Sequence, residues 1–334
     1  MSIILAIESS CDDTSAAIIK DGVVCSNIVY TQKIHEEFGG VVPELASRNH
    51  EKNIVVTVEK AIVAAGVSIQ DIEAVAFTRG PGLIGSLLVG VCFAKSFALA
   101  HNLPLIEVNH MQAHVLSPFI ENRDIEFPLI CMVVSGGHTQ LVYMKDYLDM
   151  EIIGSTIDDA AGEAFDKAAK MLGLDYPGGP LVDKWAKEGN PNAFKFAKPR
   201  IDAFDYSFSG IKTSILYFLQ KQKQQNPNFI QENLADLCAS IQHAIVEILI
   251  DKLKLSIKEY NVKSVSLAGG VSANSELRKR FVETVTSMQA KAYVPAFQYC
   301  TDNAGMIAVA AYFKYKKGLF STQSVEPLVK NYAI

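Results

Sequence analysis

The chain has no excess of basic charge: its 31 lysines and arginines are outnumbered by 36 aspartates and glutamates, giving a formal net charge of −5. No global positive field therefore attracts nucleic acid, and a nucleic-acid partner would require local basic patches or a second protein. The six cysteines include no CxxC pair, and several lie in apolar runs, where free buried thiols are common. The longest apolar helical run, residues 87–100, is interrupted by Lys95 and is too short to span a bilayer.

The first residues, MSIILAIESSCDD, contain no basic stretch and soon turn acidic. We therefore expect a core strand there and not a signal peptide. The composition, 49% hydrophobic and 20% charged over 334 residues, is typical of about two globular domains. These features predict a cytoplasmic, reduced protein that has no membrane segment.

The sequence repeats one order of units. Residues 3–20 read as strand, polar turn and strand, with "DG" leading into a third strand, and residues 128–144 repeat that pattern. Two further units recur in the same order. A strand, Gly-rich loop and helix occupy 72–99 and again 262–285, and an extended run leading into a helix occupies 103–116 and again 290–312.

Three units in one order, twice, predict a duplicated α/β fold in which each half is a mixed sheet flanked by helices, with a cleft between the halves. We assign residues 1–125 to the first half and 126–314 to the second. The stretch from about 152 to 232 has no counterpart in the first half, so we interpret it as a helical insertion. The end of the chain, about 315–334, is expected to pack back on the first half.

Several glycine-rich turns lie where such a cleft would be. "SGGH" (135–138) offers backbone N–H groups that a ligand can approach closely. "GGVSAN" (269–274) and "RGPGLIGS" (79–86) each join a strand to a helix N-terminus, a natural position for a phosphate. Such turns are often plain connectors, but several around one cleft favour a nucleotide-type ligand.

Acidic residues accompany these turns. Asp12 and Asp13 lie in the turn "CDDT", where aspartate is common for conformational reasons but can also orient a metal or a water. Asp166 and Asp183 flank the turn at Gly178 and Gly179. A carboxylate there can bind a ribose hydroxyl pair, or can simply lie on a solvated helix face.

"NHMQAH" places His110 and His114 four residues apart after an apolar strand, which puts both side chains on one helix face. They can be structural histidines or a pair of metal ligands. Two ligands alone do not hold a divalent ion. The repeat supplies a third candidate, Asp302, at the start of the equivalent helix of the other half, although aspartate there can also be an N-cap. Two histidines and one carboxylate suit Fe2+, and also Zn2+.

A metalloprotease is disfavoured. The HExxH motif needs a glutamate after the first histidine to activate water, and this chain has Met111 there, followed by Gln112.

Taken together, these motifs resemble one family from residue 3 to about 314. They are IESSCDDTSAA, GGVVPELASRNH, TRGPGLIGSLLVG, NHMQAH, VSGGHTQLV, DDAAGEAFDKAAKMLGL, YPGGP, YSFSGIKT, LAGGVSAN and CTDNAG. The chain is similar to the TsaD family of tRNA threonylcarbamoyladenosine transferases, of bacterial type. The resemblance implies the duplicated actin, sugar-kinase and Hsp70-like (ASKHA, RNase H-like) fold.

The resemblance also implies roles for individual residues. By position, His110, His114 and Asp302 match the family's metal ligands, and Asp12 and Asp13 match its acidic, candidate catalytic turn, although Asp13 is usually glutamate in the family. The residues that match its substrate-binding positions are Val133, Val134, Ser135, Gly136, Gly137, Asp166, Gly179, Asp183 and Asn274.

The family reaction moves a threonylcarbamoyl group from threonylcarbamoyl-AMP to N6 of the adenosine 3′ of the anticodon. The resemblance therefore implies one divalent metal, with Fe2+ favoured and Zn2+ second, and an adenine nucleotide: the donor itself, and ATP or ADP as alternatives. It implies tRNA as substrate, a TsaB-like paralogue and a TsaE-like ATPase as partners, and a TsaC-like synthase as the source of the donor. The rival readings on this fold are an ATP-dependent sugar-kinase-like enzyme and a non-catalytic, ATP-controlled scaffold.

Overall fold

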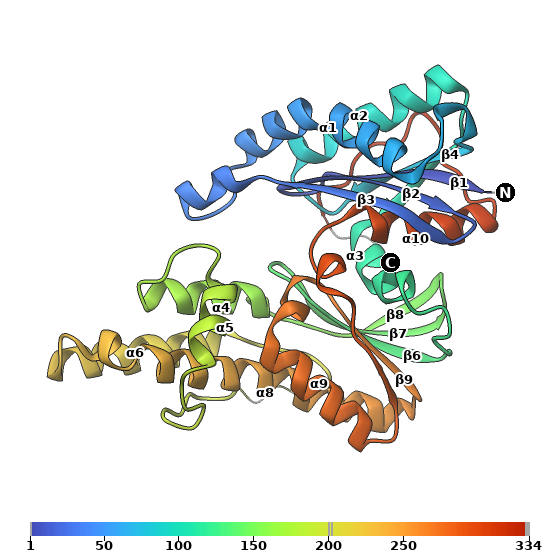
Figure 1. Cartoon of the computed structure of the whole chain (residues 1–334). Coiled ribbons are helices and arrows are strands. Elements are labelled where there is room, and N and C mark those ends of the chain that lie inside the picture. The colour runs from blue at the N-terminus through green and yellow to red at the C-terminus, as the bar shows by residue number, and fades with distance from the viewer. Residues whose placement is uncertain (1, 200, 202, 331–334) are drawn as a thin grey trace. The chain divides into compact units, whose positions relative to one another are not determined.

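The computed structural model describes residues 2–199, 201 and 203–330, and these fold into two compact units. The first comprises residues 1–125, 146–149 and 296–334, and the second residues 126–145 and 150–295. Figure 1 traces the chain through both. Residues 331–334 of the C-terminal segment lie outside the described residues.

The first unit is built on a five-stranded sheet of order β3-β2-β1-β4-β5. β1 pairs antiparallel with β2 and parallel with β4. All six residues of β1 are buried, as expected for a central strand covered on both faces. The strands are β1 (Ile3–Glu8), β2 (Asp13–Lys20), β3 (Val23–Thr31), β4 (Ala74–Gly80) and β5 (Leu105–Asn109).

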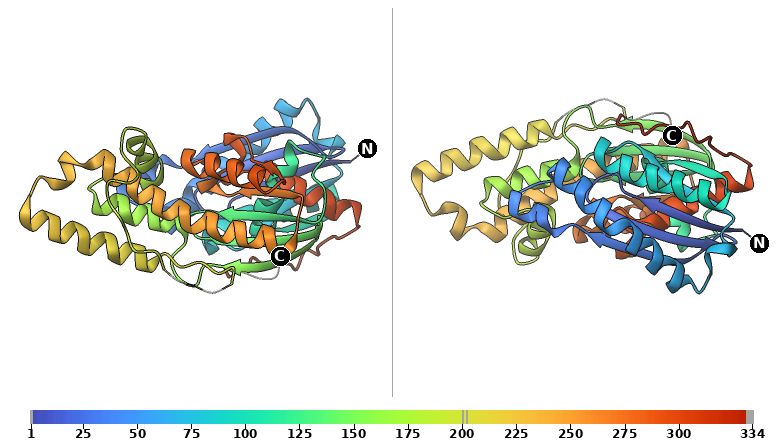
Figure 2. Two further views of the ribbon diagram at one scale, coloured as in Figure 1. Left: turned by 90° about the horizontal axis from the view of Figure 1, so that it is seen from below. Right: turned by 90° about the horizontal axis from the view of Figure 1, so that it is seen from above.

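Helices cover both faces of this sheet. α1 and α2 pack on one face, and α10 packs on β1, β2 and β3 from the other (Figures 1 and 2). The helices are α1 (Pro43–Ala65), α2 (Ile84–His101), α3 (His110–Leu116) and α10 (Ala304–Lys316), with short 3-10 turns η1 (Lys33–Phe38), η2 (Ile69–Asp71), η3 (Ser117–Ile120) and η5 (Phe297–Tyr299).

The second unit repeats the sheet, in the order β10-β9-β6-β7-β8. β6 pairs antiparallel with β7 and parallel with β9, as β1 does with β2 and β4. The predicted duplication is therefore present, strand for strand. The strands are β6 (Leu129–Val134), β7 (Thr139–Asp146), β8 (Asp149–Ser155), β9 (Ser264–Ala268) and β10 (Lys291–Tyr293).

A group of helices forms the core of the second unit with β6, β7 and β9. The helical insertion lies between β8, the counterpart of β3, and α8. The elements are α4 (Ala161–Met171), α5 (Gly178–Ala186), α6 (Ser209–Gln225), α7 (Phe229–Glu232), α8 (Leu234–Tyr260), η4 (Gly270–Ala273) and α9 (Ser275–Ser287).

Two sequence expectations need correction. α10 was assigned to the second half, but residues 296–314 belong to the first compact unit, because the buried side chains of α10 pack on the first sheet. α2 is longer than its apolar run, and at 18 residues it is the one helix within 2–199, 201 and 203–330 that meets the length and composition of a membrane span. A core helix meets the same test, and in this unit α2 packs against α1 and β4.

The end of the described chain packs back on the first unit, in the region where we expected it. Ser321 N donates to Leu105 O, Leu328 N donates to Arg79 O, and Lys95 Nζ donates to Val325 O. The segment thereby covers the end of β4 and the edge strand β5.

Candidate functional site

The histidine pair is positioned by the end of β5. The Asn109 side chain accepts hydrogen bonds from the N–H groups of Met111 and Gln112, so it caps α3 and starts the helix at His110. His110 and His114 then lie one turn apart on the same face, with ring centroids 4.7 Å apart. Both side chains are buried. Met111 and Gln112 are also buried, and no glutamate follows His110, which agrees with the exclusion of a zincin.

Asp302 lies just before α10 and is not that helix's cap. Asn303 is the N-cap, and its side chain accepts a hydrogen bond from Met306 N. The N-terminus of α10 is further held by Ser15 Oγ, which accepts from Ala304 N, and by Asn27 Oδ1, which accepts from Gly305 N. The Asp302 carboxylate is therefore free of the capping role and turns towards the histidines.

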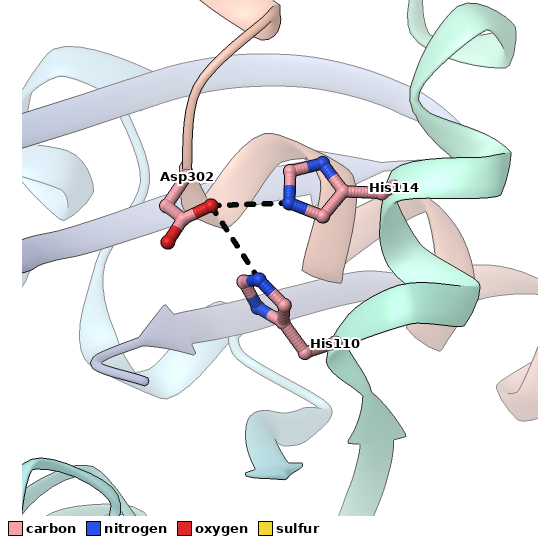
Figure 3. Close-up of side chains that lie close together, drawn as sticks. All are labelled: His110, His114 and Asp302. Atoms are coloured by element: carbon pink, nitrogen blue, oxygen red, sulfur yellow. Dashed lines mark hydrogen bonds and ion pairs between the residues drawn. The ribbon is translucent and has the colours of Figure 1, made fainter. Parts of the chain in front are cut away.

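The three side chains meet within the first unit (Figure 3). Asp302 Oδ1 lies 3.0 Å from His114 Nε2 and 3.4 Å from His110 Nε2. One ligand atom from each residue lies within 4.8 Å of the others. The sequence predicted this set but placed Asp302 in the other half. The structure brings it to the histidines because α10 packs on the first sheet.

The electrostatics of the cluster suit a cation. Burial alone would raise the pKa of Asp302, but His110 and His114 outweigh it and hold that pKa well below its usual range. Burial alone would lower the pKa of His110, but the charges of Asp302 and Glu8 raise it well above its usual value. Two imidazole nitrogens and a carboxylate, largely buried, fit Fe2+ or Zn2+ by donor type.

The turn between β1 and β2 carries Asp12 and Asp13. Asp13 Oδ1 is buried and has no hydrogen-bond partner among the described residues. Burial, together with the negative charges of Asp302 and Asp12, raises the pKa of Asp13 to about 7. A carboxyl group in this state can exchange a proton near neutral pH.

Two helices hold this turn from the same side. His50 Nε2, from α1, lies 2.9 Å from Cys11 O, and Ser86 Oγ, from α2, donates to the same carbonyl at 3.0 Å. His50 Nδ1 lies 2.7 Å from Thr14 Oγ1. Burial lowers the pKa of His50, which favours the neutral ring, and a neutral ring with hydrogen on Nε2 satisfies both contacts. The sequence alone does not indicate a role for either residue, because their partners are 36 to 75 residues away.

Glu8, the last residue of β1, is a further site residue that the sequence alone did not indicate. Its carboxylate is fully buried, and Oε2 lies 3.1 Å from His110 Nδ1. Burial would raise the pKa of Glu8, but His110 and a hydrogen bond from Ser10 outweigh it and lower that pKa. The available signal was a single carboxylate closing an otherwise apolar strand, IILAIE.

In the second unit, the β6–β7 turn carries the expected substrate-binding hairpin. Val133 and Val134 are buried at the end of β6. Ser135 N donates to His138 O at 2.8 Å and closes the turn. Gly136 and Gly137 are exposed, and a Cβ at either position would meet no atom within 4 Å. Neither packing nor a positive φ requires glycine here, which leaves the backbone open to a ligand.

The remaining candidate residues lie around α5 and α9 and have structural partners. Asp166 Oδ1 accepts from Gly178 N and Gly179 N, so it caps α5. Asp183 Oδ1 accepts from Ser275 N and Oγ, which ties α5 to the start of α9.

Asn274 has a similar double role. Its Oδ1 caps α9 by accepting from Leu277 N, and its Nδ2 donates to Gln242 Oε1. Each candidate of this group thus orders the unit locally, and nucleotide binding would be a second role.

The same group lies next to the hairpin. Gly162, at the start of α4, donates its N–H to Ser135 O, and Asp166 follows one turn later on that helix. Gly269, before η4, lies so close to Val134 O that a Cβ would approach it to 2.5 Å. The structure therefore brings the hairpin, α4 and the 269–274 loop together within the second unit.

Comparison with solved structures identifies the fold. The chain resembles full-length HypF with a TM-score of 0.64 at 16% identity, covering 95% of this chain and 46% of that one. It resembles component A of (R)-2-hydroxyglutaryl-CoA dehydratase from Acidaminococcus fermentans with a TM-score of 0.55 at 13% identity, covering 95% and 99%. Both have the duplicated ASKHA fold, and at these identities the likeness concerns the fold alone.

Comparison of sequences identifies the family. The family model of tRNA N6-adenosine threonylcarbamoyltransferase, TsaD, matches residues 23–309. Proteins of that name are 57% identical in Christiangramia forsetii, over 96% of both chains, and 56% identical in Riemerella anatipestifer, over 97% of this chain and 96% of that one. The resemblance seen in the motifs is confirmed. The chain belongs to the TsaD family of tRNA N6-adenosine threonylcarbamoyltransferases, the enzymes that form threonylcarbamoyladenosine in tRNA.

Proposed function

We propose that this chain transfers the threonylcarbamoyl group of threonylcarbamoyl-AMP to N6 of the adenosine 3′-adjacent to the anticodon, in tRNAs that read codons beginning with A. The observation that carries the proposal is the buried cluster of His110, His114 and Asp302, in a chain that matches the family over residues 23–309. A sugar-kinase-like enzyme would not need this cluster, and neither would an ATP-controlled scaffold.

The reaction forms a carbon–nitrogen bond and breaks a carbon–oxygen bond and an N–H bond. N6 of adenosine attacks the carbamoyl carbon, the bond from that carbon to the phosphate oxygen breaks, AMP leaves, and one proton leaves N6. The donor is already an activated anhydride, so the protein needs no covalent nucleophile. The acceptor amine is weak, and orientation must therefore contribute much of the rate. The target base lies in a single-stranded loop, where exposing it is inexpensive.

A divalent cation held by His110, His114 and Asp302, Fe2+ by preference and Zn2+ as second choice, would supply Lewis-acid polarisation of the donor's oxygens when bound. The chain's own contribution is to keep three ligands together in a buried place before the ion arrives. α3 presents the two imidazoles, and Asn303 leaves Asp302 free by taking over the cap of α10.

Donor binding is assigned to the second unit. Gly136 and Gly137 are exposed, and their backbone N–H groups can stabilise negative charge that develops on the carbamoyl oxygen. Asp166, Gly179, Asp183 and Asn274 are the proposed contacts for the nucleotide part, which would be shared by ATP or ADP. Val133, Val134 and Ser135 supply the rigid end of β6 on which the hairpin stands.

Proton removal is assigned to Asp13, and Asp12 is proposed to support the same turn. Asp13 combines a buried oxygen that lacks a hydrogen-bond partner with a pKa raised to about 7 by burial and by the neighbouring carboxylates. Both properties suit a general base that works at neutral pH.

The direct test incubates the chain with threonylcarbamoyl-AMP and unmodified tRNA, with and without partner proteins, and analyses the nucleosides by mass. We expect threonylcarbamoyladenosine to form, and the double variant His110→Ala/His114→Ala to form none. His101→Ala is the matched control, since His101 lies on α2 outside the cluster. Absence of the modified nucleoside under every partner condition would refute the proposal.

A TsaB-like paralogue is proposed to dock on α1 and α2. Both helices expose apolar side chains, including Val55 and Val63 on α1 and Leu88 on α2. A groove between them is lined by Glu51, Ile54, Leu88, Val89, Cys92 and Phe93. A surface of this kind on two adjacent helices suits a helical partner face.

A charge in the groove tests this docking. We expect Leu88→Lys to abolish co-elution with the paralogue in gel filtration. Ile152→Lys, on the similarly exposed side chain of β8, should leave co-elution intact. Equal complex formation by both variants would exclude this face.

The remaining assignments follow the family. We propose a cytoplasmic enzyme that works with a TsaE-like ATPase and receives its donor from a TsaC-like synthase.

A further inference from the structure

Glu8 is a buried carboxylate next to the candidate metal cluster, and it is not itself one of the three ligands. It closes β1, and its exposed fraction is 0%. The parallel register of β1 and β4, with Ile7 opposite Phe77, brings the end of β1 beside Thr78. A charged group is rarely buried unless several donors compensate for its lost hydration.

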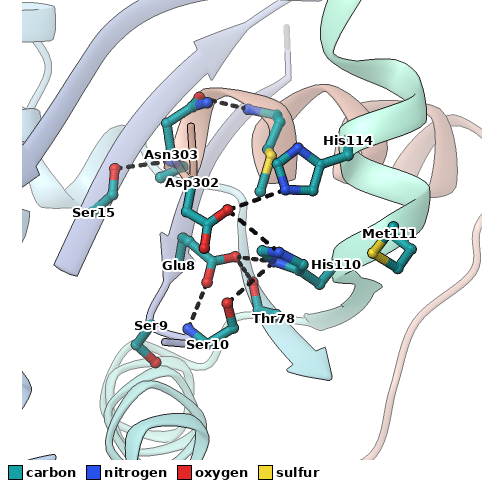
Figure 4. A network of polar contacts seen from close by, with 12 residues as sticks. Glu8, Ser9, Ser10, Ser15, Thr78, His110, Met111, His114, Asp302 and Asn303 are labelled. Carbon is teal, nitrogen blue, oxygen red and sulfur yellow. Dashed lines mark hydrogen bonds and ion pairs between the residues drawn. The ribbon is translucent and has the colours of Figure 1, made fainter. Parts of the chain in front are cut away.

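Three contacts engage this carboxylate, and a fourth reaches the His110 nitrogen that faces it (Figure 4). Oε1 accepts a hydrogen bond from Ser10 N at 2.5 Å, and Oε2 accepts one from Thr78 Oγ1 at 2.5 Å. Oε2 also lies 3.1 Å from His110 Nδ1. Ser10 Oγ lies 3.2 Å from the same Nδ1. Both carboxylate oxygens are thus engaged, one by a backbone N–H that can only donate.

These contacts define the protonation of the His110 ring. A carboxylate only accepts hydrogen bonds, so the imidazole nitrogen that faces it carries the hydrogen. The raised pKa of His110 keeps a proton on Nε2 as well in the metal-free chain. When that proton leaves, Nδ1 keeps its hydrogen and Nε2 has a free lone pair. Nε2 is the atom on the Asp302 side of the ring, 3.4 Å from Asp302 Oδ1.

His114 lacks this arrangement. Its Nδ1 is buried and has no hydrogen-bond partner among residues 2–199, 201 and 203–330. Its Nε2 contacts Asp302 instead. The two ligands are therefore held differently: His110 by a carboxylate behind it, and His114 by α3 and Asp302 alone.

We propose that Glu8 is a positioning residue that fixes His110 in the tautomer with hydrogen on Nδ1, so that Nε2 is ready to bind the metal. The proposal rests on the proposed function of the cluster as a metal site. Carboxylates behind metal-binding histidines raise ligand basicity and fix the ring, and their loss typically costs about 10- to 100-fold in metal affinity.

Glu8→Gln is the sharpest variant because it keeps the shape and removes one acceptor. The amide has a single acceptor oxygen, and Ser10 N–H requires it, so the NH2 group turns to His110 Nδ1. That nitrogen must then accept, the hydrogen moves to Nε2, and Nε2 loses the lone pair that the metal needs. Thr78→Val is the matched control, since it removes a hydrogen bond from the same carboxylate oxygen without changing the partner of Nδ1.

Two readouts test this in the full chain. The first is the tautomer of His110 from long-range 1H–15N correlation of the metal-free protein, recorded at a pH above the raised pKa of His110 so that the ring is neutral. We expect hydrogen on Nδ1 in wild type and Thr78→Val, and on Nε2 in Glu8→Gln. The second is Zn2+ and anaerobic Fe2+ affinity by competition with a chelator. We expect about 10- to 100-fold weaker binding in Glu8→Gln and less than about threefold change in Thr78→Val.

The outcomes separate the two claims. Wild-type His110 with hydrogen on Nε2 would overturn the role of Glu8 without any variant, so a Glu8→Gln chain that fails to fold does not remove the test. Equal metal affinity in wild type and Glu8→Gln would also overturn it. A wild-type chain that binds neither ion would instead overturn the metal site itself.

Discussion

The β1–β2 and β6–β7 turns occupy equivalent positions in two sheets of identical order, yet they have opposite character. The first carries carboxylates, is largely buried, and is held at Cys11 O by side chains from α1 and α2. The second carries Gly136 and Gly137, is exposed, and closes on itself through Ser135 and His138. The duplicated fold therefore contains two similar hairpins with different properties. The β1–β2 turn carries charged side chains, and the β6–β7 turn exposes its backbone.

Loss of the metal cluster should have the largest effect. In the variant Asp302→Asn the carboxylate ligand is replaced by a neutral amide, and loss of a direct ligand should exceed the 10- to 100-fold typical of outer partners. We expect threonylcarbamoyl transfer to fall by more than about 100-fold, measured by nucleoside mass analysis. Binding of threonylcarbamoyl-AMP by the second unit's turn should still be measurable by calorimetry. If Asp302→Asn transfers at the wild-type rate, the reaction does not depend on a metal held by this cluster.

Removal of the proposed general base in the β1–β2 turn should have the second-largest effect on transfer. Asp13→Asn cannot take the N6 proton, and we expect transfer to fall about 100-fold, at the low end for a lost general base. Asp13→Glu keeps a carboxylate in this turn and should keep most of the activity.

The pH dependence gives a second test of Asp13. The deprotonated form is the active one, so the wild-type rate should rise with pH through about 7, the raised pKa of this carboxyl, and level off above it. Because the folded pKa is higher than the unfolded one, the stabilisation by protonated Asp13 is complete below about pH 4 and is lost as pH rises through about 7. Asp13→Asn should show neither change, and a wild-type rate that is flat between pH 6 and 8 would contradict the assignment.

A methyl group added to the β6–β7 turn should slow transfer while leaving the stability of the fold nearly unchanged. Gly137→Ala adds a Cβ that meets no atom within 4 Å, so the free energy of unfolding should change by less than about 1 kcal/mol. The methyl group would shift a donor bound against the backbone, and we expect about tenfold slower transfer.

Gly210→Ala, at the start of α6, is the control for this change, since its Cβ would meet only Pro199 Cβ at an ordinary van der Waals distance of 3.9 Å. Transfer by Gly137→Ala at the same rate as by Gly210→Ala would exclude close approach of the donor to the hairpin.

Loss of one of the hydrogen bonds that hold the β1–β2 turn at Cys11 O should have the smallest effect on transfer. Ser86→Ala removes one of the two hydrogen bonds to Cys11 O, worth about 1 kcal/mol. We expect about a fivefold lower kcat with KM for the donor unchanged. His50→Gln can replace both contacts of the ring and should retain more activity than His50→Ala. A change confined to KM would contradict a role in positioning the turn.

The duplication could be predicted from the sequence, because hairpin and strand–loop–helix patterns depend on local spacing. The sheet on which α10 packs could not be predicted from the sequence. Residues 304–311 are buried all round, so the helix has no polar face that would indicate which sheet it covers. Asp302 was therefore correctly grouped with the histidines although its unit was wrong.

Glu8 and the structural partners of Asp166 and Asp183 could not be inferred for a related reason. Glu8 meets Thr78 and His110 at separations of 70 and 102 residues, and only the packed sheet brings them together. Asp166 and Asp183 do cap and tie helices, but a helix-face pattern does not reveal which N–H groups they meet.

The central claim is that the cluster in the first unit holds a divalent ion on which transfer depends. The most direct measurement strips the chain of metal, assays single-turnover transfer to tRNA with the donor and partners present, and then adds Fe2+. We expect no transfer by the stripped chain, recovery on addition of Fe2+, and no recovery in His114→Ala. A stripped chain that transfers at the full rate would contradict the central claim.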